Sequence, residues 1–270
     1  MKALFIGLTG IDYVYYLDSF PEENNKCKTN DYSKYIGGPA ANAAITYAAM
    51  GGDATLITAL GCSAEGRAVE EELTSLGVKV INVAKDNKLP GISTICISED
   101  GKRTIISGQN CFEEIDLSQL ELSEYGFALM DCNQQDVSLP LLDKLTCPIV
   151  LDAGSYKPNI EKYLEKATIV ISSENFRDEQ GNDIFSMPFD NIELRAKTRG
   201  EKSILTAKGE IEVEQVQCID SLAAGDIFHG AFCYAYFERD CTFEIALKYG
   251  SAAATESVKY RGPREWIDRI

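Results

Sequence analysis

The segment that decides the fold reads Asp220-Ser221-Leu222-Ala223-Ala224-Gly225-Asp226-Ile227-Phe228. It follows a strand-like stretch at 212–219 and opens a long amphipathic helical pattern at 225–238. Because the residues at 223–225 are small, another group can approach their backbone closely. The first N–H groups of a helix have no partners within it, and the helix dipole makes this end positive. The segment therefore predicts an anion-binding site at the start of a helix.

Asp226 lies in the first turn of this predicted helix, beside the anion site. Such a pair suits phosphoryl transfer, because N–H groups stabilise charge on the moving phosphoryl group while a carboxylate accepts the proton of the attacking hydroxyl. We expect the helix N-terminus to lower the pKa of Asp226 and to make it a weak base. A purely structural turn stays open at this point, since Asp is favoured in the first turn of any helix.

A second motif, Gly37-Gly38-Pro39-Ala40-Ala41-Asn42, combines a glycine pair with a helical stretch of small residues. Bare glycines let a polyol lie against the backbone. The Asn42 amide offers a donor and an acceptor to a hydroxyl group, which suits a sugar. Taken alone, however, the motif is better explained as a turn before a closely packed helix.

The rest of the chain alternates between short apolar stretches and helical patterns. Strands are predicted at 2–8, 53–60, 127–131, 148–152, 168–172 and 203–206, and helices at 40–50, 66–76, 137–144, 159–166, 188–199, 242–259 and 263–269. This alternation indicates a mostly parallel sheet with helices on both faces, whose ligands bind at the carboxyl ends of the strands.

Two regions, about 13–35 and 91–107, break this rhythm. The second holds two alternating runs around Glu99-Asp100-Gly101-Lys102, and an Asp-Gly pair in such a place is a strong hairpin signal. We expect both regions to form a small antiparallel flap, or lid, that closes over a pocket and excludes water. Arg103 in this flap is a candidate for binding a phosphate or an anionic group of the substrate.

The segment Asp220–Ala231 resembles the signature Asp-Thr-x-(Gly/Ala)-Ala-Gly-Asp-x-Phe of the ribokinase-like (PfkB-type) carbohydrate kinase family. The resemblance implies a three-layer α/β/α sandwich with a mostly parallel central sheet and a small antiparallel flap. It implies that Asp226 is the general base and that Ala223, Ala224 and Gly225 supply the anion hole. The acceptor would be a sugar or sugar-like molecule, the donor ATP with Mg²⁺, and two copies would pair through the flap.

In the same family a Gly-Gly-x-x-x-Asn segment lines the sugar pocket, and this chain matches it at Gly37, Gly38 and Asn42. Asp12, just past the first predicted strand, matches the carboxylate that binds sugar hydroxyls in the family. Two motifs in the family's order make a chance match improbable.

The chain departs from the family pattern near the expected metal and nucleotide. The family's Asn-x-x-Glu, which arranges magnesium and its waters, is replaced by Ser173 and Phe176, so that Glu174 becomes a substitute candidate. Thr206, Lys208 and Gly209 are candidates for contacts with ATP, but the hairpin that follows them in the family is predicted to be deleted.

Two further calls concern the C-terminal third of the chain. Asp220 is grouped with the residues that bind the nucleotide. The segment Arg261–Pro263 is short where many relatives complete a monovalent-cation site, which argues against activation by K⁺ while leaving it open.

Composition narrows the classes of function. The chain has 270 residues and a formal net charge of −16, which disfavours nucleic-acid binding. One histidine argues against Ser-His-Asp and multi-histidine metal sites, and nine cysteines without C-x-x-C spacing are predicted to be reduced. With no signal peptide and no stretch apolar enough to span a membrane, we expect one cytoplasmic domain over 1–270.

An ATP-dependent sugar kinase is therefore the favoured function. A non-catalytic sugar- or nucleotide-binding protein with a degenerate kinase fold is the first alternative, motivated by the missing Asn-x-x-Glu. A nucleoside or vitamin-alcohol kinase is the second, because the same chemistry serves several acceptors.

Overall fold

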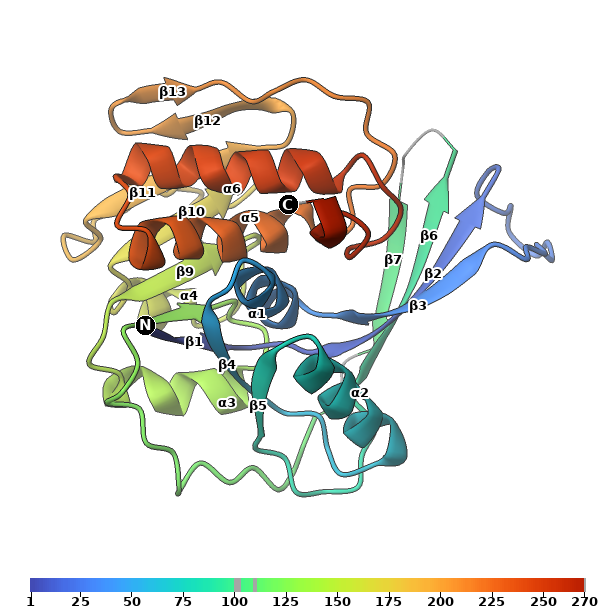
Figure 1. The fold of residues 1–270 in the computed structure, drawn as a ribbon, viewed down its shortest axis with the longest axis horizontal. Coiled ribbons are helices and arrows are strands. Elements are labelled where there is room, and N and C mark those ends of the chain that lie inside the picture. The colour runs from blue at the N-terminus through green and yellow to red at the C-terminus, as the bar shows by residue number, and fades with distance from the viewer. Residues whose placement is uncertain (100–102, 109–110, 270) are drawn as a thin grey trace.

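The computed structural model describes residues 1–99, 103–108 and 111–269. Within them the central sheet has the order β13-β12-β11-β10-β9-β8-β1-β4-β5 (Figure 1). The strands from β11 to β5 in this order are parallel, whereas β12 and β13 are antiparallel at one edge. The bounds are β1 (Lys2–Ile6), β4 (Asp53–Thr58), β5 (Val78–Asn82), β8 (Phe127–Met130), β9 (Ile149–Ala153), β10 (Ile169–Ser173), β11 (Leu194–Arg199), β12 (Lys202–Thr206) and β13 (Gly209–Ile211).

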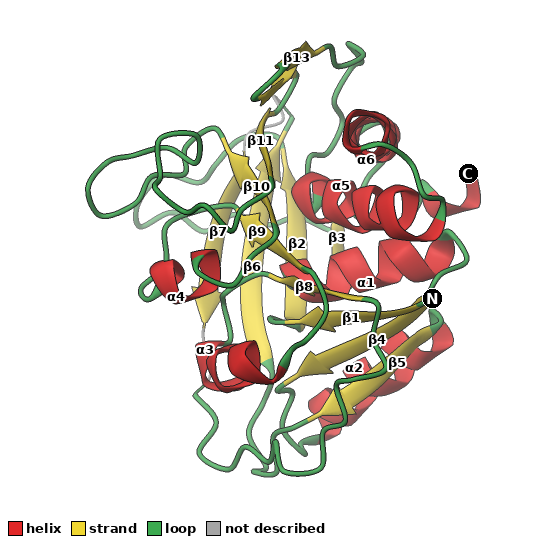
Figure 2. Cartoon of the chain, turned by 90° about the vertical axis from the view of Figure 1, so that its left-hand side faces the viewer, coloured by secondary structure: helices red, strands yellow, loops and turns green. Residues whose placement is uncertain are grey.

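Helices cover both faces of this sheet, as Figure 2 shows. Along β1, Ala3 and Phe5 belong to the apolar core shared with α1, α2, α5 and α6, whereas Leu4 and Ile6 belong to the core shared with α3 and α4. This alternation follows from the two-residue period of a strand. The helices are α1 (Pro39–Ala49), α2 (Ala64–Ser75), α3 (Gln135–Ser138), α4 (Ile160–Leu164), α5 (Ala224–Cys233) and α6 (Phe243–Ser257), with 3₁₀ turns η1 (Leu139–Lys144) and η3 (Ile267–Arg269) and a π turn η2 (Tyr234–Glu238).

A second, four-stranded sheet of order β3-β2-β6-β7 projects from one end of this body (Figure 1). Its strands are β2 (Gly10–Leu17), β3 (Tyr32–Gly37), β6 (Gly91–Ser98) and β7 (Arg103–Gly108). β2 pairs with β3 and β6 with β7 in antiparallel fashion, while the middle pair β2–β6 is parallel. The two regions predicted to form a flap supply most of this sheet; the predicted Asp-Gly turn lies outside the described residues.

The three-layer α/β/α architecture with a mostly parallel sheet is confirmed, but three local predictions are wrong. The stretch 263–269, predicted as a helix, consists of turns that end in the 3₁₀ turn η3. The stretch 188–199, predicted as a helix, contains β11, which pairs with β10 from Ile169 opposite Leu194. Its residues are good helix formers, so the free energy of extending the sheet and burying Ala196 outweighs local propensity. The strand-like stretch 212–219 is irregular, because no neighbouring strand is in place to pair with it.

In the part of the chain that the structure describes, every helix is too short or too polar to cross a membrane.

Candidate active site

The two motifs meet where α1 and α5 pack together. Nδ2 of Asn42 in α1 donates a hydrogen bond to Oδ2 of Asp226 in the first turn of α5, at 2.7 Å. The approach of the two helices needs Gly230, since a Cβ atom there would lie 2.4 Å from the carbonyl oxygen of Ala43. Residues that are 184 positions apart in the sequence therefore form one polar pair.

Sequence reasoning missed the third member of this group, Arg264. Its Nη2 donates to Oδ1 of Asn42 at 2.6 Å and to the carbonyl of Ile36 at 3.1 Å. An arginine can only donate, so it fixes the Asn42 amide with the oxygen toward Arg264 and the nitrogen toward Asp226. Arg264 belongs to no recognisable motif, and only the path of the C-terminal segment brings it here.

The environment of Asp226 differs from the sequence prediction. Burial and the nearby Asp152 carboxylate raise the pKa of Asp226 to about 7, although the Asn42 hydrogen bond and His229 oppose the shift. The expectation that the helix N-terminus would lower this pKa is wrong, because loss of water and a like charge outweigh the dipole. A carboxyl with a pKa near 7 is a competent general base at neutral pH.

Asp12 and the glycine pair lie beside this group. A Cβ atom at Gly37 would lie 2.2 Å from Oδ2 of Asp12, and one at Gly38 would lie 2.2 Å from the carbonyl oxygen of Leu8. Gly38 also has φ +99°, which disfavours residues with a side chain. Burial raises the pKa of Asp12, while a hydrogen bond from Ser93 opposes the shift. The glycines are therefore required to seat Asp12 and to start α1.

Asp131 is a second residue that the sequence did not reveal. Its carboxylate is 1% exposed and accepts hydrogen bonds from the backbone N–H groups of Leu8 (2.9 Å), Ala40 (3.0 Å) and Asn133 (2.8 Å). It thus joins the carboxyl end of β1 to the first turn of α1. We assign it a scaffolding role behind the Asn42–Asp226 pair.

The start of α5 has the properties of an anion hole. Ala223 has φ +59°, and α5 begins at the next residue. Among the described residues, the backbone N–H groups of Gly225 and Asp226 have no hydrogen-bond acceptor. No heavy atom lies within 4 Å of the position where Gly225 would carry a Cβ, apart from its chain neighbours and its own helix. These two residues present free donors to an open space, whereas the Ala224 N–H donates to the Ser221 carbonyl at 3.3 Å.

A cavity of about 270 Å³ adjoins this helix start. Ser221, Ala224, Gly225 and His229 are among the residues that line it. Its apolar lining comes from Ile204, Val213, Val216, Ala254 and Val258, and polar side chains such as Thr198, Glu201 and Glu214 line it as well. The cavity combines a phosphate-type anion site with an apolar wall, which suits a nucleotide.

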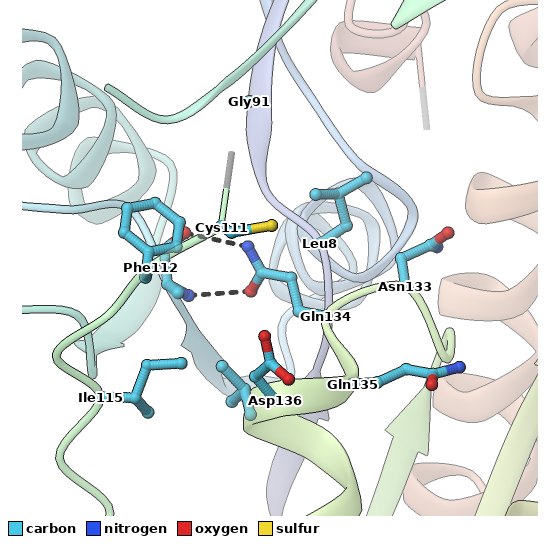
Figure 3. A pocket seen from close by; sticks show the side chains of 11 residues that line it. Leu8, Gly91, Cys111, Phe112, Ile115, Asn133, Gln134, Gln135 and Asp136 are labelled. Carbon is cyan, nitrogen blue, oxygen red and sulfur yellow. Dashed lines mark hydrogen bonds between the residues drawn. The ribbon is translucent and has the colours of Figure 1, made fainter. Parts of the chain in front are cut away.

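A smaller cavity, of about 100 Å³, lies at the carboxyl end of β1 (Figure 3). Leu8, Asn133 and Gln134 are among the residues that line it. The Gln134 amide is held by Ala59, whose N–H donates to Oε1 at 2.8 Å and whose carbonyl accepts from Nε2 at 2.9 Å. Leu8, which lines this cavity, also donates its backbone N–H to Asp131.

The residues predicted to contact ATP lie apart from the larger cavity. Thr206 and Gly209 flank the turn between β12 and β13, where Thr206 Oγ1 donates to the Gly209 carbonyl at 2.9 Å. Lys208 is 80% exposed at its side chain and forms a 2.7 Å ion pair with Glu244. β12 and β13 pair around a two-residue turn at 207–208, and between β13 and α5 the described residues form no further strand, as the predicted loss of the following hairpin requires.

Glu174, the predicted metal ligand, belongs to no cluster of metal-ligating side chains within the described residues. Glu174 pairs with Lys202 at 3.2 Å on the exposed side of the sheet. Phe176, where the family has Glu, is fully buried in the apolar core. Asp152 at the carboxyl end of β9 and, with a smaller effect, Asp131 are the carboxylates that raise the pKa of Asp226. Within the described residues, His, Cys, Asp and Glu form no cluster of three or more that could hold a metal ion.

Arg103 and Asp220 both lie against the start of α5. Nη1 of Arg103 donates to the carbonyl of Ser221 at 2.8 Å, so its guanidinium contacts protein backbone here. Asp220 is 3% exposed and accepts hydrogen bonds from protein donors.

The comparisons with known proteins agree with this geometry. Residues 2–269 match the family model described as pfkB family carbohydrate kinase. The chain is 23% identical to a ribokinase of Haemophilus influenzae over 287 residues, covering 97% of this chain and 94% of that protein. It is 22% identical to a nucleoside kinase of Methanocaldococcus jannaschii, covering 97% and 91%. The crystal structure of a putative ribokinase from Agrobacterium tumefaciens has the same fold, with a TM-score of 0.81 at 21% identity over 100% of this chain and 99% of that one.

The chain belongs to the PfkB family of carbohydrate kinases. It is an ATP-dependent phosphotransferase with a ribokinase-like fold, of the group that phosphorylates sugars or nucleosides.

Proposed function

We propose that this kinase moves the γ-phosphoryl group of ATP to a hydroxyl of a sugar or sugar-like molecule, with Asp226 as general base. One observation carries the proposal: the ordered group Arg264–Asn42–Asp226 lies beside the free N–H groups of Gly225 and Asp226. A base next to an anion hole is what an attacking hydroxyl and a moving phosphoryl group require.

The acceptor would bind between Asp12, Gly38 and Asn42, with its reacting hydroxyl within hydrogen-bond distance of Asp226. As the hydroxyl oxygen bonds to the γ-phosphorus, its proton passes to Asp226 and the bond from phosphorus to the β–γ bridging oxygen breaks. ADP and the phosphorylated acceptor are the products. The N–H groups at 223–226 would stabilise the negative charge on the transferred group.

Magnesium is expected to accompany ATP, and oxygen ligands such as the Asp152 carboxylate suit it. Asp152 is partly exposed, and Nδ1 of His229 lies 3.7 Å from its Oδ2. Asp152 would hold the ion, whose chemical contribution would be to offset the negative charge of the phosphate groups. Glu174 remains a second candidate, provided that it leaves Lys202.

A nucleoside acceptor is the alternative that a specific observation favours. A separate cavity is lined by Leu8 and Asn133, and the chain is similar to nucleoside kinases as well as ribokinases. A base attached to the sugar would need such additional space. A non-catalytic binding protein is disfavoured, since a binder needs no carboxyl poised at a pKa of about 7.

The test is ADP release from magnesium-ATP across ketoses, aldoses, sugar acids and nucleosides. We expect turnover with one acceptor class and a loss of roughly 10³-fold in kcat for Asp226→Asn. Asp190→Asn, on an exposed turn, is the matched control and should keep full activity. Sugar binding without ADP release from any acceptor would instead favour the non-catalytic alternative.

We further propose a homodimer that forms through the four-stranded sheet. Its edge strand β7 exposes Ile105 (46%) and Ile106 (69%), and the opposite edge exposes Tyr32 (62%). Apolar edge strands are places where a second chain can add. Sedimentation should give a dimer for the native chain and a monomer for Ile106→Lys; an unchanged dimer in that variant would place the interface elsewhere.

A further inference from the structure

The segment 220–225, which we call the anion loop, is joined to the four-stranded sheet through Asp220. The carboxylate of Asp220 accepts hydrogen bonds from Tyr16 Oη (3.0 Å), from the backbone N–H of Gly262 (2.9 Å) and from the backbone N–H of Leu222 (2.8 Å). One buried side chain thus ties together strand β2, the C-terminal segment and the anion loop. Burial and the Asp220 carboxylate raise the pKa of Tyr16, so its hydroxyl keeps the proton that it donates.

The apolar residue of the loop is also packed into this sheet. Leu222 is 7% exposed and forms a small core with Val14, Ile95 and Ile97, against which Tyr16 packs. These three partners lie on β2 and β6, the middle strands of the sheet. The loop therefore buries its side chain in the sheet rather than in the main body.

Two arginines complete the junction. Arg103 at the start of β7 donates to the carbonyl of Ser221 at 2.8 Å. Arg261 lies over the Tyr16 ring, 4.5 Å from its centroid, and forms a 2.6 Å ion pair with Asp31. Polar contacts from the sheet thus reach Asp220 and Ser221, the first two residues of the loop.

The loop needs such support because its own conformation is unfavourable. Ala223 has φ +59°, a region that residues with a Cβ atom rarely adopt. The turn before it is closed by the bond from the Leu222 N–H to Asp220. If Asp220 shifts, that turn opens. The free N–H groups of Gly225 and Asp226 then no longer point together into the anion-binding space.

We propose that Tyr16 is a positioning residue, which holds the anion loop in its anion-binding geometry while the four-stranded sheet is docked on it. Docking of the sheet then does more than cover the acceptor: it completes the anion hole through the bond from Tyr16 to Asp220. The inference rests on the proposed function for its effect on catalysis, but not for its effect on the loop.

The test is Tyr16→Phe, which removes one hydroxyl and keeps the ring under Arg261 and against Leu222. We expect kcat to fall roughly 10- to 100-fold while the KM for the acceptor changes less than about threefold, because the loop contacts the moving phosphoryl group. The matched control is Tyr15→Phe. Tyr15 directly precedes Tyr16 in β2, so its side chain points to the other face of the four-stranded sheet, where it stacks on Tyr32. It should behave like the native enzyme.

A second readout needs no substrate. Amide hydrogen exchange of 220–226 should speed up at least about fivefold in Tyr16→Phe, with the rest of the chain unchanged. Arg103→Gln, an exposed change that leaves the core intact, should give a smaller increase in the same segment. Native-like exchange of 220–226 together with native kcat in Tyr16→Phe would overturn the inference.

Faster exchange over the whole chain, with a lowered Tm, would also overturn it, since Tyr16 would then be merely structural. If the native enzyme turned over no acceptor, the proposed function would fail, and the exchange of 220–226 would still decide the role of Tyr16.

Discussion

The acceptor side and the nucleotide side of the site are built differently. On the acceptor side, Asn42, Asp226 and Arg264 form a chain of short hydrogen bonds at 2.6–2.7 Å, and Asp12 has no room to move past Gly37. On the nucleotide side, Lys208 is exposed and paired with Glu244. Under the proposed function, the contrast teaches that preorganisation is concentrated where the proton would move, whereas the nucleotide would meet an apolar cavity and backbone N–H groups.

Apart from substitutions of Asp226, we expect Arg264→Met to cause the largest loss of activity on the acceptor side. Without the guanidinium the Asn42 amide is free to rotate, and we expect kcat/KM to fall roughly 10²-fold, as loss of a charge-assisted hydrogen bond implies. Steady-state kinetics and a thermal melt would measure this. Arg269→Met, outside the site and stacked on Tyr260 at 5.6 Å, is the control. A loss below threefold would mean that other contacts orient Asn42.

The pH dependence of kcat/KM tests the acceptor side without any substitution. Because Asp226 must be ionised to accept a proton and its pKa is raised to about 7, kcat/KM should rise about tenfold from pH 6 to pH 8 and then level off. The measurement is kcat/KM in buffers of constant ionic strength. A profile that is flat from pH 5.5 upward would restore the first expectation, that the helix N-terminus keeps this pKa low.

The nucleotide side should respond less to a single change. For Lys208→Ala we expect the KM for ATP to rise less than about threefold, since an exposed ion pair contributes little and Lys208 lies outside the cavity lining. A rise above tenfold would instead mean that the β12–β13 turn moves onto the phosphates.

The smallest effect is expected from exchanging K⁺ for Na⁺. The segment 261–263 is held by protein contacts, from the Gly262 N–H to Asp220 at 2.9 Å and from Arg261 to Asp31 at 2.6 Å. We therefore expect that no cation is needed to order it and that kcat changes less than about twofold at constant ionic strength. Strong activation by K⁺ alone would show that these contacts yield to an ion.

Much of the site could be predicted because it depends on local chemistry. The small residues of the anion loop, the carboxylate after them and the glycine pair before Asn42 each have a physical meaning within a few positions. Arg264, Asp131 and Tyr16 could not be found in this way. Each acts through contacts with residues far away in the chain, and nothing in its own neighbourhood marks it.

The fold errors have the same cause. Residues 194–199 carry helix-forming side chains, yet β10 offers an open edge that extends the sheet. The stretch 212–219 has strand-like residues but no strand beside it. In both places the partner, rather than the local pattern, decides the conformation.

The sequence by itself determined the alternation of strands and helices, the helix start at 223–226 and the presence of a base beside it, because these depend on short-range sterics and hydrogen bonding. Only the tertiary structure decided the pKa of Asp226, the orientation of Asn42 and the support of the anion loop by Tyr16. Those properties arise from burial and from charges and hydrogen-bond donors that different segments bring together. Neither the burial nor this grouping of charges and donors exists until the chain has folded.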